Sequence, residues 1–164
     1  MSTGQMMLVL GAMALLSIVM LSANRTYVTT GKTILYSELG ITAVSLSTSV
    51  IQDAEEKAFD ANTFNTPVTS LSSLTPVNSL GPESGEVYPD YNDFDDYNTL
   101  VTSKTFPSSG TFNISCSVCY VDTSNPNVAS STVTWSKKLT VTVTCPSMPD
   151  TIRESYIYSY FYFR

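Results

Sequence analysis

The sequence MMLVLGAMALLSIVML, residues 6–21, is an apolar run without a single charged residue. Ser17 is its one polar side chain, and the first charged residue of the chain is Arg25. The chain that follows is polar, acidic and rich in Ser and Thr. A helix of sixteen such residues cannot stay exposed to water. The run therefore predicts a helix that ends in a bilayer or in a bundle of other helices.

Two interpretations of this run place it in a membrane and require no packing with copies of the chain. A secretory signal peptide fits the apolar length, and Leu21-Ser22-Ala23 fits a cleavage site, but residues 1–5 contain no Lys or Arg. A permanent transmembrane anchor would span about 24 Å at about 1.5 Å per residue, which is shorter than a hydrocarbon core of about 30 Å. Each interpretation thus fits only in part.

A third interpretation is a helix that sits in the membrane for a time and then packs with copies of itself. Gly11, Ala12, Ala14 and Ser17 allow helix backbones to approach closely, and the methionines of the run supply adaptable packing. A buried core helix of one globular domain is disfavoured, because such a helix in so polar a chain would show a polar face.

A second helical pattern follows the apolar run. Between residues 33 and 59 apolar side chains recur every three or four positions, which indicates an amphipathic helix lying on a sheet. This stripe consists of Leu35, Leu39, Ala43, Leu46, Val50, Ala54 and Ala58. Residues 24–32 are rich in Thr and contain Gly31, and both residue types form helices weakly. The sequence therefore predicts one long helix that is interrupted near residues 26–31.

The rest of the chain predicts a loop followed by a sheet. Prolines and glycines punctuate residues 60–98, which we expect to form a long loop. From residue 100 the apolar period becomes two. Strands are expected at 100–106, 111–121, 132–145 and 152–163, with turns at 107–110, 125–127 and 146–150. The order indicates an antiparallel meander covered by the helix. The fold class is α+β, with residues 1–25 as a hydrophobic segment and 26–164 as a globular head.

The densest charge cluster is DYNDFDDYN at residues 90–98. Carboxylate and amide oxygens so close in sequence can coordinate a hard cation such as calcium. The candidate ligands are Asp90, Asn92, Asp93, Asp95 and Asp96. Their spacing differs from that of an EF-hand loop, and a solvated acidic turn is the simpler interpretation of the same residues. We expect no other cofactor.

The three cysteines predict one disulfide and one leftover thiol if the protein is exported. The predicted strand at 111–121 has one apolar face, formed by Phe112, Ile114, Cys116, Val118 and Tyr120. Cys145 shares the apolar face of the next predicted strand, so a Cys116–Cys145 bridge would join two inward faces. A bridge between Cys119 and Cys145 is the alternative if a bulge intervenes, and three reduced cysteines are the remaining possibility.

The last predicted strand is unusually aromatic. Tyr156, Tyr158, Tyr160 and Tyr162 line one face, and Ile157, Phe161 and Phe163 line the other. Ordinary cross-strand packing explains such a row of tyrosines. A partner-binding surface explains it equally well, because an apolar ring with a polar tip suits an interface.

Composition excludes several classes of function. The net charge is −6 and the eight basic residues are scattered, so we expect no nucleic-acid partner. Histidine is absent, which removes imidazole ligands and the Ser-His-Asp arrangement. The seven glycines are dispersed and form no phosphate-binding loop. We therefore expect no enzymatic activity.

The order of these parts resembles a type IV pilin or a pseudopilin of type II secretion. The segment IQDAEEKAFD at residues 51–60 and the segment at 95–98 are also similar to pilin-like proteins. In that family a leader is clipped and the fifth mature residue is usually Glu. If Met1 is the mature terminus, Gln5 occupies that position, where it can hydrogen-bond a neighbour's terminal amine but cannot neutralise it. Family members sometimes hold calcium in a loop.

The resemblance implies a structural subunit that polymerises into an extracellular, cell-surface filament, with adhesion or motility as downstream roles. Its partners would be copies of itself, and the inner membrane would hold it before assembly. The residues expected in the polymerisation core are Gln5, Met6, Met7, Leu8, Val9, Leu10, Met13, Leu15, Leu16, Ile18, Val19, Met20 and Leu21. The alternative is a membrane-anchored binding module that holds a surface ligand through the tyrosine-rich last strand or the acidic loop. An exported soluble domain cleaved near Asn24 is the third possibility.

Overall fold

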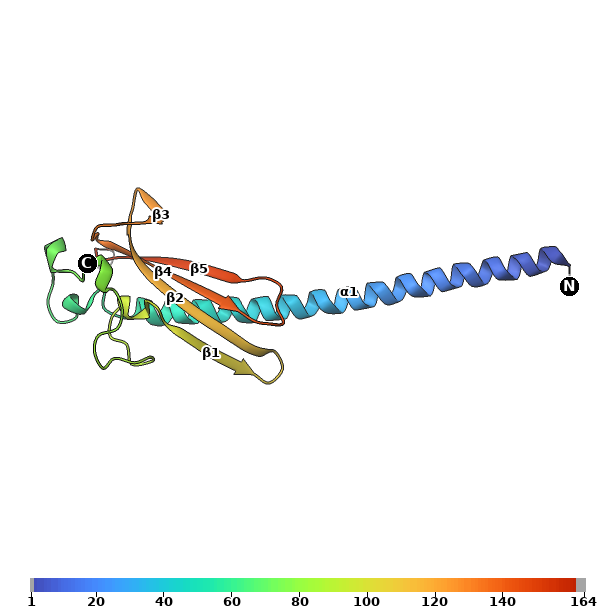
Figure 1. Ribbon diagram of the computed structural model, residues 1–164, viewed down its shortest axis with the longest axis horizontal. Helices are drawn as coiled ribbons and strands as arrows, with labels where there is room; N and C mark the ends of the chain where they lie inside the picture. The colour runs from blue at the N-terminus through green and yellow to red at the C-terminus, as the bar shows by residue number, and fades with distance from the viewer. Residues whose placement is uncertain (1, 162–164) are drawn as a thin grey trace. The chain divides into compact units, whose positions relative to one another are not determined.

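A computed structural model describes residues 2–161 of the chain. The chain divides into two compact units, Met1–Glu38 and Leu39–Arg164. The sequence analysis predicted this boundary earlier in the chain, after residue 25. The first unit is helical, and the second contains the last part of the same helix, a long loop and an antiparallel sheet (Figure 1).

Helix α1 (Thr3–Glu55) is continuous, so the interruption expected near residues 26–31 is absent. Polar side chains in this region are accommodated within the helix, as the hydroxyl of Thr26 donates to the Ser22 carbonyl at 3.0 Å. Gly31 costs about 1 kcal/mol relative to Ala. Regular turns on both sides offset this cost, because extending an existing helix needs no new nucleation.

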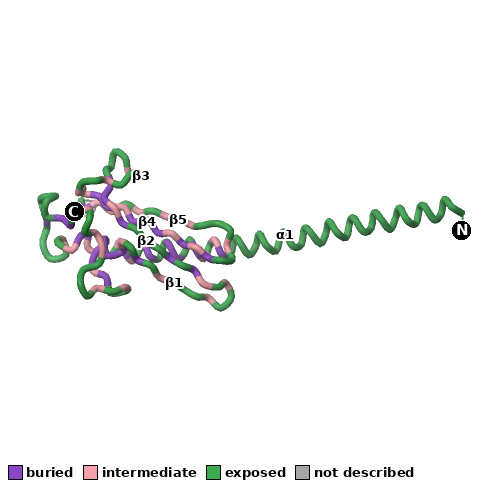
Figure 2. The backbone as a smooth tube through the Cα atoms, viewed as in Figure 1, coloured by how far each residue is buried: buried purple, intermediate pink, exposed green. Residues whose placement is uncertain are grey.

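The first unit leaves its apolar run exposed. Every residue from 2 to 38 is exposed to solvent (Figure 2). Helix α1 is long and apolar enough to cross a membrane, and none of its most apolar window is buried. An apolar surface of this length is unfavourable in water.

In the second unit, α1 buries one stripe against the sheet. The buried residues are Leu39, Ala43, Leu46, Ser47, Val50 and Ala54. Their spacing of three or four confirms the predicted amphipathic face. Leu35 lies before the start of this packing and is exposed. The helix ends at Glu55, earlier than the expected residue 59.

The sheet confirms the antiparallel meander and the α+β class. Its main strands are β1 (Val101–Phe106), β2 (Gly110–Asp122), β4 (Ser136–Thr144) and β5 (Ile152–Ser159), and they lie in the order β1-β2-β4-β5. Strand β4 begins later than the predicted residue 132. Strand β5 ends at Ser159, earlier than the predicted residue 163, and the chain turns at residues 160 and 161. The prediction for residues 162 and 163 lies outside the described part of the chain.

Strand β3 (Asn125–Ala129) pairs with β2 and occupies the segment where a turn was expected. The turn lies just before it, where the Asp122 carboxylate accepts hydrogen bonds from the amide and hydroxyl of Ser124 at 2.8 and 2.7 Å. Pro126 is compatible with a strand that pairs on one side only.

Alternation along β2 separates the core from solvent. Its inward residues Phe112, Ile114, Cys116, Val118 and Tyr120 are all buried, as predicted. The outward residues between them are polar and mostly exposed. The inward face of β2 shares a hydrophobic cluster with β4 and the buried stripe of α1, and this cluster is the main core of the second unit.

The loop between α1 and β1 carries only short 3-10 helices among the described residues. They are η1 (Ala61–Thr63), η2 (Leu71–Ser73), η3 (Val77–Ser79) and η4 (Asp95–Tyr97). The loop is tied to the chain just after α1, because the amide of Ala58 donates to the Asn92 carbonyl at 3.2 Å and the amide of Phe94 donates to the Ala58 carbonyl at 2.8 Å. These bonds fix the acidic stretch in the core.

Candidate functional site

The acidic stretch divides between solvent and core. Asp93, Asp95 and Asp96 are completely buried, whereas Asp90 is exposed. Burying three carboxylates is expensive unless each one finds donors or a cation. Asp95 receives a lysine ammonium group, whereas Asp96 accepts backbone amides. This difference defines two neighbouring polar sites.

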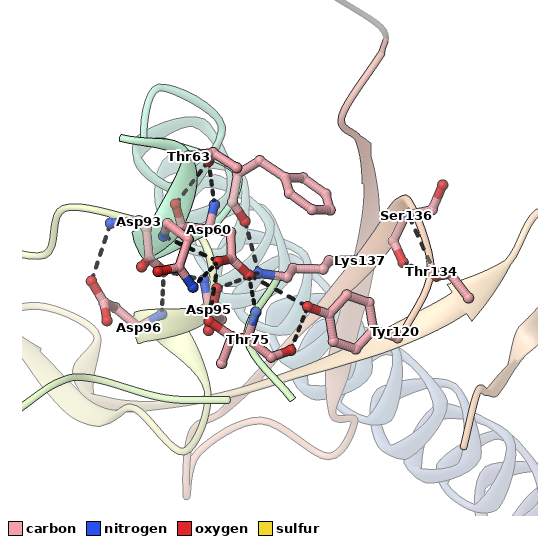
Figure 3. Close-up of polar contacts among 12 residues, drawn as sticks. Asp60, Thr63, Thr75, Asp93, Asp95, Asp96, Tyr120, Thr134, Ser136 and Lys137 are labelled. Atoms are coloured by element: carbon pink, nitrogen blue, oxygen red, sulfur yellow. Dashed lines mark hydrogen bonds and ion pairs between the residues drawn. The ribbon is translucent and has the colours of Figure 1, made fainter. Parts of the chain in front are cut away.

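The first site surrounds Lys137, which lies on the inward face of β4. Its ammonium donates to the Phe59 carbonyl and to Asp60 Oδ2, both at 2.8 Å, and it also contacts Asp95 Oδ1 (Figure 3). The side chains of Lys137, Asp60 and Asp95 are fully buried. The rings of Phe59 and Tyr120 lie 4.7 and 5.3 Å from the ammonium, within the range of cation–π attraction.

Asp60 is held from several directions. Its carboxylate accepts hydrogen bonds from the Thr75 amide at 3.0 Å and the Thr75 hydroxyl at 3.1 Å, and from the Asn62 amide at 3.1 Å. Burial alone would raise the pKa of Asp60, but the Lys137 charge and these hydrogen bonds outweigh it and lower the pKa. Asp60 is therefore an ionised partner of Lys137 that joins the loop to β4.

Asp93 organises the backbone of η4. Its Oδ1 accepts from the amides of Asp95 at 2.8 Å and Asp96 at 3.3 Å. Burial, together with the nearby charges of Asp95 and Asp96, raises the pKa of Asp93 to about 9. A protonated Asp93 at neutral pH reduces the charge that the core must hold.

The second site contains three carboxylates, and no basic residue among residues 2–161 forms an ion pair with them. One carboxylate oxygen from each of Glu83, Glu86 and Asp96 lies within 4.8 Å of the other two. Asp96 Oδ2 accepts from the amides of Asn92 at 3.0 Å and Asp93 at 3.1 Å. Its Oδ1 is buried and has no hydrogen-bond partner within residues 2–161, and the same is true of Oδ2 of Asp93 and Oδ2 of Asp95. We call Glu83, Glu86 and Asp96 the carboxylate cluster.

A tight turn brings Glu83 and Glu86 together. The Glu86 amide donates to the Glu83 carbonyl at 3.1 Å, and the Glu83 amide donates to Glu86 Oε2 at 3.0 Å. Gly85 has φ +100°, a conformation that glycine adopts without strain. Desolvation, a hydrogen bond with Glu86 and the charges of Asp96 and Glu86 raise the pKa of Glu83 to about 7. Like charges are therefore crowded here.

The five predicted calcium ligands are not gathered around one point. Asp90 is exposed, Asp95 pairs with Lys137, and Asp93 holds the amides of η4. Asp96 alone of the five belongs to the carboxylate cluster, although the Asn92 side chain contacts Glu86. The sequence-based ligand set is thus divided between two sites.

Sequence reasoning missed Lys137, Asp60, Glu83 and Glu86. A signal for Lys137 was present in the sequence. Lys137 alternates with Leu139 and Val141 along the strand, so it lies on the same inward face as these two residues and is a buried charge. The signal for the glutamates was weaker, since two acids three residues apart around a glycine are common in exposed turns.

The tyrosine face of β5 packs inward. Tyr156 and Tyr158 pack on the main core, and Tyr160 is buried in a second cluster with Phe59, Val68, Leu74 and Tyr120. The hydroxyl of Tyr156 donates to Glu55 at 2.9 Å, and that of Tyr160 accepts from the Val68 amide at 2.8 Å. These three rings serve packing, whereas Tyr162 lies outside the described residues.

All three cysteines are free thiols, which corrects the disulfide prediction. Cys116 pairs with Val141, which is four residues before Cys145. At about 3.3 Å per residue the two cysteines are separated by about 13 Å along the sheet, and a disulfide needs Cα atoms within about 7 Å. Cys119 pairs with Lys138, which is farther still from Cys145. Both pairings therefore fail on strand register.

The apolar residues expected in the polymerisation core are exposed along α1. Their exposed fractions range from 49% at Val9 to 76% at Met7. The Gln5 side chain accepts a hydrogen bond from the Ser2 amide at 3.2 Å, which caps the start of the helix. The apolar members of this set are thus left exposed by the described part of the chain.

Comparisons with models of known protein families, with curated proteins and with solved structures found no match. What the fold and sites establish is an α+β protein with a helix that is long and apolar enough to span a membrane.

Proposed function

We propose that this chain is the structural subunit of an extracellular, type IV pilus-like helical filament, which polymerises through the apolar residues of α1. Two observations carry the proposal together: the whole apolar run is exposed, and the second unit already has its own core. That second unit needs no contribution from residues 2–38 to bury its apolar side chains.

Two environments can cover this run. As an unassembled subunit, the chain would rest with residues 6–21 in the inner membrane. In a filament, the same residues would pack against those of neighbouring copies, where Gly11 and Ala14 permit close approach. Burying each large apolar side chain away from water stabilises by about 1.5–3 kcal/mol. Repeated contacts that do not close on themselves give a fibre rather than a ring.

The second unit would form the outer layer of such a filament. The outward positions of β2 carry Asn113, Ser115 and Ser117, which are exposed. Polar outer positions of this kind suit a surface in contact with water. The unit performs no chemistry in this proposal, and its contribution is a folded and soluble coat.

A membrane-anchored binding module is the second candidate. Tyr156, Tyr158 and Tyr160 pack inward, which disfavours this part of the chain as its binding face. The carboxylate cluster, in which Glu83 is exposed, is the observation that favours this candidate.

Substitution of Leu15 tests the proposal. Leu15→Asp places a charge in the middle of the run and should abolish fibres in electron micrographs of cell-surface material, because a buried unpaired charge is strongly unfavourable. Leu15→Met keeps the site apolar and should leave the fibre yield unchanged. Tryptophan fluorescence of Trp135 reports whether the second unit stays folded.

Fibres of normal yield from folded Leu15→Asp protein would contradict polymerisation through this run. Unchanged protein that stays monomeric in the membrane, with no fibres at all, would instead support the anchored binding module.

A further inference from the structure

Lys137 and Asp95 are in direct contact in the core of the second unit, and both are shielded from solvent. Their side chains are completely buried, and the Asp95 carboxylate accepts a hydrogen bond from the Lys137 ammonium (Figure 3). The ring centres of Phe59 and Tyr120, which are themselves buried, lie 4.7 and 5.3 Å from the ammonium nitrogen. An amine and a carboxyl group held together in this way meet the positional requirement for forming an amide.

Asp60 contacts the same nitrogen and is held firmly in place. Its Oδ2 accepts from Lys137 Nζ at 2.8 Å, and its carboxylate also accepts from the amide and the hydroxyl of Thr75. Despite burial, the Lys137 charge and these hydrogen bonds lower the pKa of Asp60, so it is a carboxylate. A carboxylate within hydrogen-bond reach of a nitrogen can take a proton from it.

Asp95 differs from Asp60 in ways that suit it to react. Burial raises the pKa of Asp95 above its ordinary value, although the Lys137 charge opposes this. While both groups are ionised, Oδ2 of Asp93 and Oδ2 of Asp95 have no hydrogen-bond donor. Burial, the Asp95 charge and a side-chain hydrogen bond with Asp95 raise the pKa of Asp93 to about 9, so Asp93 carries a proton at neutral pH that it can donate to Asp95. A donor at a carboxyl oxygen stabilises the negative charge that develops there when the carbon is attacked.

We propose that Lys137 and Asp95 become joined by an isopeptide bond between Nζ and Cγ after the chain has folded. The ammonium first passes one proton to Asp95, which leaves a neutral amine beside a neutral carboxylic acid. Burial favours such a neutral pair, because it penalises each of the two charges. The amine is a nucleophile, whereas the ammonium is not, and Nζ then attacks Cγ.

The atoms and protons of this step balance. The bond from Nζ to Cγ forms, and the bond from Cγ to one Asp95 oxygen breaks. Asp60 takes a proton from the attacking nitrogen and delivers it to the departing hydroxyl, which leaves as water, and Asp60 is then a carboxylate again. One ammonium and one carboxylate thus give one amide and one water molecule, so no oxidant or other reactant is needed. The ion pair seen in the structure is the state before this reaction.

The bond would close a covalent loop from residue 95 to residue 137. It would fasten η4, in the long loop, to strand β4. A cross-link lowers the conformational entropy of the unfolded chain, so the second unit would resist unfolding more strongly. This inference does not depend on whether the chain forms filaments, because both residues lie within the second unit.

Mass spectrometry of the full chain, purified in detergent, tests the bond. A protease digest should contain a branched peptide in which Lys137 is joined to Asp95. Its mass should equal that of the two separate peptides less one water molecule. Because the link is located within a peptide, other processing of the chain does not affect the result.

Three variants and one matched control sharpen the test. Asp95→Ala removes the carboxyl group and Lys137→Met removes the nucleophile, so each should abolish the branched peptide. Asp60→Asn keeps both reactants but removes the proton carrier, so the link should form about a hundredfold more slowly in a time course that starts with cell-free synthesis in detergent. Lys138→Met changes the adjacent, partly exposed lysine and should leave the branched peptide unchanged.

The unchanged protein decides the proposal even where a variant does not fold. Folded protein, as judged by Trp135 fluorescence, that yields only separate peptides after prolonged incubation at neutral pH would overturn it. A water loss confined to one peptide would overturn it as well, because it would indicate an aspartate that has cyclised onto its own backbone. A link from Lys137 to Asp60, or an unchanged rate in Asp60→Asn, would contradict the roles given to the two aspartates.

Discussion

Lys137 Nζ lies 2.8 Å from Asp60 Oδ2, and neither side chain is exposed to solvent. Asp95 contacts the same ammonium. Removing the cation by Lys137→Met should leave two carboxylates buried without compensation and destabilise the second unit by about 3–5 kcal/mol. Urea unfolding of the full chain in detergent, followed by Trp135 fluorescence, measures this loss.

The adjacent lysine is the matched control for that substitution. Lys138 is partly exposed and donates one hydrogen bond to the Pro126 carbonyl at 2.9 Å. Lys138→Met should therefore cost about 1 kcal/mol. Equal losses for the two variants would show that the buried ion pair is not the feature that distinguishes Lys137.

The pH dependence of stability should report on Asp60. Its folded-state pKa lies below the ordinary value of 3.8, because the Lys137 charge and hydrogen bonds outweigh burial. Its contribution is therefore complete above that ordinary value and is lost as the pH falls through the folded-state pKa. The groups facing it are Lys137 on β4, Asp95 on η4 and Tyr120 on β2.

Comparison with Asp60→Asn isolates this contribution from other acids that titrate nearby. Below about pH 4 the stability of unchanged protein should fall more steeply than that of Asp60→Asn, since the variant has no proton to gain at this position. Parallel curves for the two proteins below that pH would show that Asp60 is not held in its ionised form.

Two leucines one turn apart should respond differently to truncation. Leu39 is 1% exposed and packs in the main core, whereas Leu35 is 43% exposed. Leu39→Ala should cost about 2–5 kcal/mol in urea unfolding, while Leu35→Ala should cost well under 1 kcal/mol. A larger cost at Leu35 would place the start of helix packing earlier than Leu39.

Thiol labelling checks the free cysteines. Alkylation of protein denatured without reductant should modify all three, as no disulfide joins them. In native protein Cys119 should react first because it is partly exposed, whereas Cys116 is buried and burial raises its pKa to about 11. Two residues protected from alkylation in denatured protein, and released by reductant, would indicate a disulfide.

The sequence predicted elements where one physical signal dominated. Strand alternation located the inward face of β2 from Phe112 to Tyr120, and the helical period located the stripe from Leu39 to Ala54. The helix interruption was wrong because local propensity at Gly31 was weighed without the long helical context on either side. Strand β3 was missed because Asn125 and Pro126 read as turn residues, whereas pairing with β2 overrides that preference.

The polar sites depended on contacts that the sequence does not encode locally. Asp60 and Lys137 are 77 residues apart and meet only when the loop folds over β4. The division between Asp95 and Asp96 follows from η4, whose turn points one carboxylate at Lys137 and the other at the turn of Glu83 and Glu86. The disulfide pairing failed for a similar reason, since shared inward faces do not fix strand register.

A cryo-electron microscopy reconstruction of fibres from the cell surface tests the central claim most directly. The account predicts fibres built from this chain, with residues 6–21 packed as helices along the central axis and the sheets outside. Material in which this chain is a single globule without residues 6–21, or fibres whose core is formed by the sheets, would contradict it.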